Sequence, residues 1–104
     1  MALVIGLERG ETVFIGKGET EIKVTITDIM GPTRFKIFVE TPSMDYRYEI
    51  SGDYTVSVGT KIVIGCGTGG TARKARVLIQ APRHIEIERG KWRDKQKENG
   101  NEKA

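Results

Sequence analysis

Residues 75–89 read ARVLIQAPRHIEIER. This stretch gives the clearest indication of the fold. Apolar residues recur at every second position on either side of Pro82, as the side chains on one face of a half-buried strand do. They are Val77, Ile79 and Ala81 before the proline, and Ile85 and Ile87 after it. Pro82 has a fixed φ and no backbone N–H, so it favours a tight corner. We therefore expect two strands joined at this corner, the second of which ends at Arg89.

The same alternation continues upstream and predicts several more strands. The expected strands cover residues 3–7 and 13–15, separated by a bend at Gly10-Glu11, then 22–27, 34–40, 44–50, 54–58 and 61–64. Turn-forming residues such as Gly31-Pro32 separate these runs. Seven or more short strands with hairpin connections are typical of a small antiparallel β-sandwich or barrel. We expect an all-β fold of that kind.

Length and composition fit a single domain made of strands and turns. The chain has 104 residues, of which 13 are glycine and 3 are proline, and this length provides one modest core. We assign residues 1–92 to the β domain. Residues 93–104 are expected to form a basic flexible tail, disordered or briefly helical.

Cysteine use and hydropathy indicate where the protein works. Cys66 is the only cysteine, so an internal disulfide is excluded, and the sequence has no Cys/His cluster for a metal. A single thiol suits a reducing cytoplasm. The apolar run before Glu8 is too short for a signal peptide and lacks a basic start, and no stretch approaches membrane-spanning length. We expect a soluble cytoplasmic protein.

Positive charge is concentrated in the second half of the chain. Residues 1–50 carry 6 lysines and arginines against 8 acidic residues, whereas residues 51–104 carry 11 against 6. Such an excess attracts phosphate backbones in a salt-sensitive and sequence-independent way. The alternative is that the charges from Lys95 to Ala104 only keep a disordered tail solvated.

A glycine motif raises the possibility of nucleotide binding. Gly65-x-Gly67-x-x-Gly70 follows an expected strand, as the fingerprint of a dinucleotide-binding fold does. That site requires a helix whose N-terminus receives the pyrophosphate. Residues 71–80 are too short for this helix and run into Pro82, so we interpret the glycines as a hairpin loop. The sequence also lacks a Ser/His/Asp group and paired catalytic carboxylates, and we predict no enzyme activity, no cofactor and no metal.

Two anchors carry a resemblance to a known family. Residues 10–16, GETVFIG, together with Ala81-Pro82 through Arg89, resemble the carbon storage regulator (CsrA/RsmA) family of small bacterial RNA-binding translational repressors. Members of that family are little more than half as long as this chain, and they form dimers in which strands of the two chains interleave. The resemblance implies the same β fold here and an RNA partner.

A weak internal repeat indicates how the longer chain relates to such a dimer. Residues 3–49 resemble one complete protomer, with Thr41-Pro42 where the family has Ala-Pro. Residues 54–92 resemble a second, in which 58–65, VGTKIVIG, echoes the first anchor. We therefore expect a fused pseudo-dimer that is monomeric in solution. The alternative is one family domain with an insertion from about Gly18 to Thr71, which would form a homodimer.

The resemblance also implies a composite RNA site. In the family, the first strand of one protomer lies beside the last strand of the other, and together they bind a GGA sequence exposed in a hairpin loop or single strand. The corresponding pair here is Leu3–Arg9 with Arg83–Arg89. Arg89 occupies the position of the family's critical arginine, and its guanidinium suits phosphates or guanine edges. The implied RNA-binding residues are Leu3, Val4, Ile5, Leu7, Arg9, Arg83, His84, Ile85, Ile87 and Arg89.

The chain departs from the family's pattern in these same strands. Leu7 and Glu8 stand where the family usually carries two basic residues, and a glutamate near the site would repel phosphate. A second composite site would pair residues 54–57 with 44–49, but it has Glu49 at the arginine position. We expect one functional RNA face and one degenerate face.

Each selected residue also has an ordinary structural explanation. Arg89 would then pair with Glu86 or Glu88 on a surface strand, His84 would face solvent, and Trp92 would cover an edge of the core. From the whole sequence we predict a regulator that binds GGA-containing mRNA leaders and represses translation. A non-catalytic interaction or ligand-sequestering protein with the same fold is the alternative.

Overall fold

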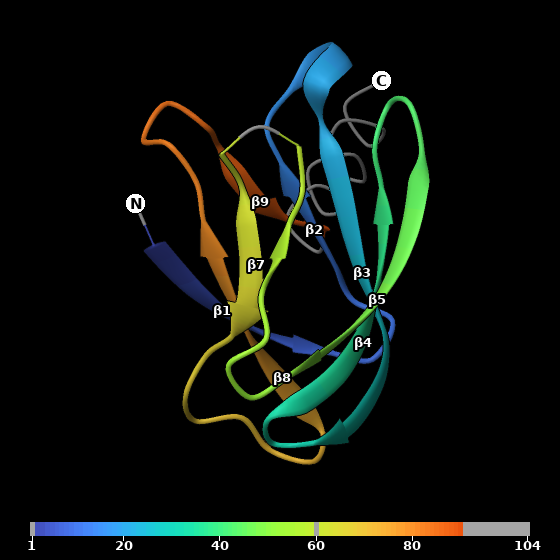
Figure 1. Ribbon diagram of the computed structural model, residues 1–104, viewed down its shortest axis with the longest axis vertical. Helices are drawn as coiled ribbons and strands as arrows, with labels where there is room; N and C mark the ends of the chain where they lie inside the picture. Colours follow the sequence, from blue (N-terminus) through green and yellow to red (C-terminus); the bar gives the residue numbers. More distant parts are fainter. Residues whose placement is uncertain (1, 60, 91–104) are drawn as a thin grey trace, which may run out of the picture.

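The computed structural model describes residues 2–59 and 61–90, which form nine β-strands and one short 3₁₀ turn (Figure 1). The elements are β1 (Ala2–Glu8), β2 (Thr12–Ile15), η1 (Gly18–Thr20), β3 (Ile22–Gly31), β4 (Arg34–Glu40), β5 (Asp45–Ser51), β6 (Val56–Ser57), β7 (Val63–Cys66), β8 (Lys74–Gln80) and β9 (Ile87–Arg89). All strand pairs between these elements are antiparallel. The expected all-β antiparallel fold is confirmed.

The strands belong to two sheets. One has four strands in the order β1-β8-β7-β6, and the other has five in the order β5-β4-β3-β2-β9. Contacts between the sheets join β1 and β8 to β3, and β7 to β5. This stacking places the edge strands β1 and β9 on one side of the sandwich and the edge strands β5 and β6 on the other.

Each sheet takes one edge strand from the opposite half of the sequence. β1 pairs with β8 along its whole length, from Ala2 opposite Gln80 to Glu8 opposite Lys74. β9 pairs with β2, where Arg89 lies opposite Val13. The two ends of the described chain are thus exchanged between the sheets, whereas β5 and β6 remain in the sheets of their own halves.

The core consists of alternating aliphatic residues from both sheets. Val77, Ile79 and Ala81 are buried on one face of β8 and its continuation, as the alternation predicts. In the part of the chain that the structure describes, no polar or charged side chain is buried. Burying one such aliphatic side chain contributes roughly 1.5–3 kcal/mol. Apolar packing, rather than a buried polar network, therefore holds the two sheets together.

The first alternating run is divided between the sheets by the bend predicted at Gly10-Glu11. Gly10 has φ 87°, a backbone conformation that glycine adopts readily. Its N–H donates to the carbonyl of Ile26 (2.7 Å), and the Ile26 N–H donates to the carbonyl of Glu11 (3.0 Å). These two bonds fix the bend against β3, so β1 and β2 lie in different sheets.

Some strands are shorter than the alternation predicts. Because Pro82 cannot donate to a sheet ladder, β8 ends before it, and the Pro82 carbonyl accepts a hydrogen bond from the Ile85 N–H (3.0 Å). Residues 83–85 therefore form a turn, and the expected strand from 83 to 89 is reduced to β9. The run at 54–58 likewise keeps only the two residues of β6.

The expected tail and Trp92 lie outside the described residues, so the predictions made for them stay predictions. None of the described residues forms a helix long and apolar enough to cross a membrane.

Candidate nucleic-acid interface

The first and last strands are edge strands on the same side of the sandwich, but they do not pair with each other. The expected pairing of residues 3–9 with 83–89 does not occur, because the bend at Gly10 and the turn after Pro82 direct β1 to β8 and β9 to β2. The expected second pairing is also absent, since β5 pairs with β4 and β6 pairs with β7. The interface must therefore be built from each edge separately.

The four expected side chains of β1 divide between the core and the surface. Ile5 is 5% exposed and Leu7 is fully buried, so neither side chain is at the surface, and contact of these two residues with RNA through their backbone stays a prediction. Both side chains are buried because they lie on the face that packs against the other sheet. Leu3 and Val4 are 38% and 42% exposed. As an edge strand, β1 also presents backbone N–H and C=O groups on its outer side.

The turn after Pro82 presents the next two expected residues to solvent. Arg83 and His84 are exposed in it, whereas Ile85 and Ile87 are partly buried and pack against the core. The two isoleucines therefore serve mainly to hold the turn and β9 against the sandwich. Arg83 and His84 are thus placed for contact with a ligand at the surface, and Ile85 reaches a ligand only through the pocket that it lines.

Arg89, the arginine singled out by the family resemblance, is half-buried on β9. It lies opposite the core residue Val13, so its side chain is on the inward-facing side of the strand. Glu86 forms an ion pair with Lys17 (2.8 Å between Oε2 and Nζ). Among the described residues Arg89 has no ion pair, and the alternative in which Glu86 or Glu88 neutralises it is not observed.

A basic cluster beside β1 was missed as a site by the sequence reasoning. It consists of Arg73, Lys74 and Arg76 at the start of β8, together with Arg9 just after β1, and all four are exposed. The register places Lys74 opposite Glu8 and Arg76 opposite Gly6. The sequence signal was the run R73-K74-x-R76. These residues are part of the positive charge of the second half of the chain. Their location beside β1 depends on the pairing of β1 with β8, which no local sequence pattern specifies.

Gly6 gives this cluster its shape. A Cβ atom at Gly6 would lie 2.9 Å from Cδ of Lys74, so the lysine's aliphatic stem lies directly across the glycine. The Cε atom of Lys74 would also lie 3.7 Å from that Cβ, so the stem covers the glycine up to its last carbon. Nearby, a hollow of about 450 Å³ is lined by Arg9 and Arg73 and also by the acidic Glu8 and Asp28. The cluster therefore adjoins a hollow of mixed charge.

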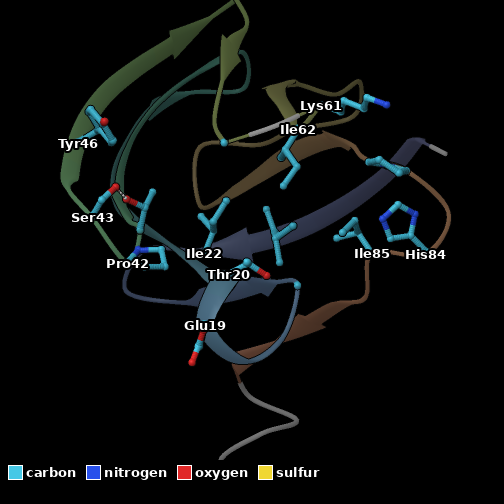
Figure 2. A pocket seen from close by; sticks show the side chains of 15 residues that line it. Glu19, Thr20, Ile22, Pro42, Ser43, Tyr46, Lys61, Ile62, His84 and Ile85 are labelled. Carbon is cyan, nitrogen blue, oxygen red and sulfur yellow. Dashed lines mark hydrogen bonds between the residues drawn. The ribbon is translucent and has the colours of Figure 1, made fainter.

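A larger pocket lies at one end of the sandwich, with Pro42 on one side of it and His84 and Ile85 on the other (Figure 2). Its volume is about 670 Å³, within the range of small-molecule sites. His84 and Lys61 lie on the same side of the opening (Figure 2). The pocket therefore joins the exposed turn at His84 to a cavity whose walls are mostly apolar and come from both halves of the chain: Ile15, Ile22, Pro42, Tyr46, Ile62, Pro82 and Ile85.

The wall of this pocket contains a strained backbone position. Lys61 has φ 62°, and it is the only non-glycine residue with positive φ among those described. Residues other than glycine, asparagine and aspartate adopt this left-handed region at an energetic cost. Gly59 nearby also has positive φ (64°), and Ile22 Cδ1 would lie 3.1 Å from a Cβ there. The turn between β6 and β7 is thus tightly shaped around the pocket.

The glycine-rich segment behaves as the expected hairpin loop. β7 and β8 are antiparallel neighbours, and the Gly67 N–H donates to the carbonyl of Arg76 (2.7 Å). Residues 74–80 form a strand where a dinucleotide fold would need a helix. Burial raises the pKa of the Cys66 thiol, which favours the unreactive protonated form. The described residues contain no group of three His, Cys, Asp or Glu side chains that would hold a metal ion.

Comparison of the chain with models of protein families, with curated proteins and with solved structures gives no match.

Proposed function

We propose that the protein is an RNA-binding regulator that binds exposed GGA sequences in mRNA leaders and represses translation in the cytoplasm. The observation that carries the proposal is the exchange of β1 and β9 between the two sheets. In the carbon storage regulator family, which the sequence resembles, strands of two protomers also interleave. The likeness is partial, because β1 pairs with β8 rather than with β9, and β5 and β6 stay in the sheets of their own halves. A fused pseudo-dimer would bring strands of the two halves together within one chain.

The edge of β1 and the basic cluster would form the binding surface. The exposed edge offers backbone donors and acceptors to unstacked bases, which are what single-stranded RNA presents for sequence recognition. Arg9, Arg73, Lys74 and Arg76 lie where the phosphates of a strand running along β1 would pass. Val4 would supply apolar contact on the face of β1 that carries the cluster, and the exposed part of Leu3 would do so from the end of the opposite face.

The proposed RNA-binding surface would extend from the edge of β1 and the basic cluster to the turn at Arg83 and His84. This turn lies next to the pocket of about 670 Å³, whose walls are flat or apolar groups such as Pro82, Ile85 and Tyr46. A base turned out of its stack would bury its faces there, and His84 would contact its edge or its phosphate. In this arrangement Arg83 would extend the phosphate contacts beyond β8.

Charge alone would give only modest affinity. Residues 1–90 carry 12 lysines and arginines against 11 acidic residues, so this part of the chain is close to neutral. The basic cluster would contact two to four phosphates, and each contact to a single strand contributes about 0.7 to the slope of log K against log salt. Specific base contacts must therefore supply much of the binding free energy.

The test compares an RNA hairpin with GGA in its loop with the same hairpin carrying CCA. Wild type is expected to prefer GGA, and K74A/R76A is expected to weaken binding about 10-fold and to lower the salt slope by about 1.4, for two lost phosphate contacts. K23A/K36A is the matched control, because it removes the same charge from the outer face of the other sheet. Equal binding to both loops, or equal effects of the two double variants, would contradict the proposal.

The pocket favours a second candidate, a ligand-sequestering protein that uses the same fold. A largely apolar cavity of this size with Lys61 and His84 at its opening suits a small anion with an apolar body, which would bind away from Glu19 on the opposite part of the lining. If wild type binds neither hairpin, thermal stabilisation by such anions should be measured. Ile85→Trp, which fills the cavity from its wall, should abolish that stabilisation, and persistence of the effect would remove this candidate.

A further inference from the structure

The edge of β5 is long, regular and uncovered by any described strand. Its seven residues pair with β4 without a bulge, from Asp45 opposite Glu40 to Ser51 opposite Arg34. Such an edge presents unpaired N–H and C=O groups, and proteins usually protect it with proline, charged side chains, a bulge or a short length. β5 has no proline, no lysine and no bulge, and its charged side chains are of both signs. The edges β6 and β9, by contrast, are only two and three residues long.

One face of this edge carries exposed apolar surface. Tyr46 and Tyr48 lie opposite Val39 and Ile37 of β4, on the side that faces the other sheet. Their rings stack with centroids 5.9 Å apart. Because β6 is so short, the facing sheet does not cover this end of β5, and Tyr46 is 36% exposed while Met44 is 57% exposed. Aromatic and methionine side chains of this kind are enriched where proteins associate.

The opposite face carries alternating charges, Asp45, Arg47 and Glu49. An antiparallel pair of two identical strands related by a twofold axis has one residue opposite its own copy at the centre. The centre of Asp45–Ser51 is Tyr48, so full-length pairing places Arg47 opposite Glu49 of the second copy, and does so twice. A register centred on Arg47 or on Glu49 instead places like charges directly opposite each other, which is destabilising.

The side chains that would meet are held in suitable positions. The Arg47 guanidinium lies 5.2 Å from the centroid of the Phe38 ring, which supports it on the outer face. Arg34 binds Glu49, but both of its hydrogen bonds end on Oε2 (2.8 and 3.1 Å). The other carboxylate oxygen, Oε1, is thus left to accept a bond from a second copy.

We propose that the protein forms a twofold dimer in which the β5 edges of two copies pair antiparallel about Tyr48, joining the two five-stranded sheets into one. This dimer does not depend on RNA binding, and it departs from the expectation that a fused pseudo-dimer is monomeric in solution. The edge of β1 is a poorer candidate, because its only charged residue, Glu8, has no complementary charge within the strand. Self-recognition by paired opposite charges is therefore a property of β5.

The test is sedimentation analysis of wild type between about 5 µM and 500 µM, a range that covers the affinities of small interfaces. Wild type should form a dimer as concentration rises. Arg47→Glu sets two carboxylates against each other at each end of the pair, and Glu49→Arg sets two guanidinium groups against each other. Each variant alone should therefore weaken dimerisation at least about 10-fold. An equimolar mixture of the two variants should restore a dimer, because each then meets the opposite charges of the other.

Glu8→Arg on β1 is the matched control and should leave the dimer unchanged. A monomeric wild type at the highest concentration, a variant as dimeric as wild type, or a mixture of folded variants that stays monomeric would overturn the proposal. If either variant fails to fold by circular dichroism, hydrogen exchange of wild type decides the question. Protection of residues 45–51 must then increase with protein concentration, and unchanged protection would overturn the proposal.

Discussion

Leu7→Ala tests whether the inward face of β1 contributes to the core or to the ligand surface. The Leu7 side chain has no solvent-accessible surface. Truncation to alanine deletes about three carbon groups, worth about 0.8 kcal/mol each by transfer, and leaves a cavity that adds to the loss. We expect the free energy of unfolding to fall by about 3 kcal/mol.

Leu3→Ala is the matched control, since it makes the same chemical change on the same strand and the same face. Leu3 is 38% exposed at the end of the sheet, so the change should cost less than about 1 kcal/mol. Urea unfolding followed by circular dichroism measures both variants. With a slope of about 1.5 kcal/mol per molar urea, the midpoint should fall by about 2 M for Leu7→Ala and by less than about 0.7 M for Leu3→Ala.

If the proposed function is right, RNA affinity should distinguish the core residue Leu7 from the surface residue Leu3. If Leu7→Ala is folded under the assay conditions, it should bind RNA as wild type does, whereas Leu3→Ala should bind more weakly because its side chain lies on the surface. A loss of stability below about 1 kcal/mol in Leu7→Ala, combined with a loss of RNA affinity, would refute the reasoning. Ile5→Val, with an expected cost of about 1 kcal/mol, provides a milder check of the same face.

Two further predictions concern local features of the second half. At Lys61, φ 62° favours glycine. The free energy of unfolding should therefore be highest for Lys61→Gly, lower for wild type and lowest for the β-branched Lys61→Val, with steps of about 1 kcal/mol. Melting temperatures in any other order would contradict the claim that the backbone is strained at this position. Burial raises the pKa of the Cys66 thiol. Its contribution to the stability of the fold is therefore fully present below the pKa of the unfolded chain, and it is lost as pH rises through the higher pKa of the folded protein. Alkylation by iodoacetamide should accordingly be slower in the folded protein than in urea at every pH from about 7 to 9, and equal rates would refute the prediction.

Local patterns located the strands, but they did not give the length of every strand or its partners. Alternation at Val77, Ile79 and Ala81 identified a strand and its buried face, because side chains on a strand alternate whatever it pairs with. The partner of that strand on its outer side is β1, which lies at the other end of the described chain. Pairing over such a distance depends on the whole sandwich, and no local signal at either strand specifies it.

The candidate site was only partly predictable for the same reason. Leu3 and Leu7 have the same residue type and the same strand parity, but one lies at the open end of a sheet and the other is enclosed between the sheets. The basic residues at 73–76 were visible as charges, yet their place beside β1 follows only from the register. Lys61 gave no signal at all, because lysine rarely adopts positive φ and only the closed turn imposes it.

The β1 edge and the β5 edge lie on opposite sides of the sandwich, although the pocket beside His84 reaches Tyr46 of β5. β5 is the edge of its sheet farthest from β9, on the side away from β1. A dimer joined through β5 would therefore carry its two β1 surfaces at the outer ends, both open to RNA. A leader with two GGA loops would bind such a dimer bivalently, with an apparent affinity above that of a single loop. Arg47→Glu, which separates the copies without touching β1, should remove this gain and leave the affinity for a single loop unchanged. A gain that survives in Arg47→Glu would mean that both loops are bound by one chain.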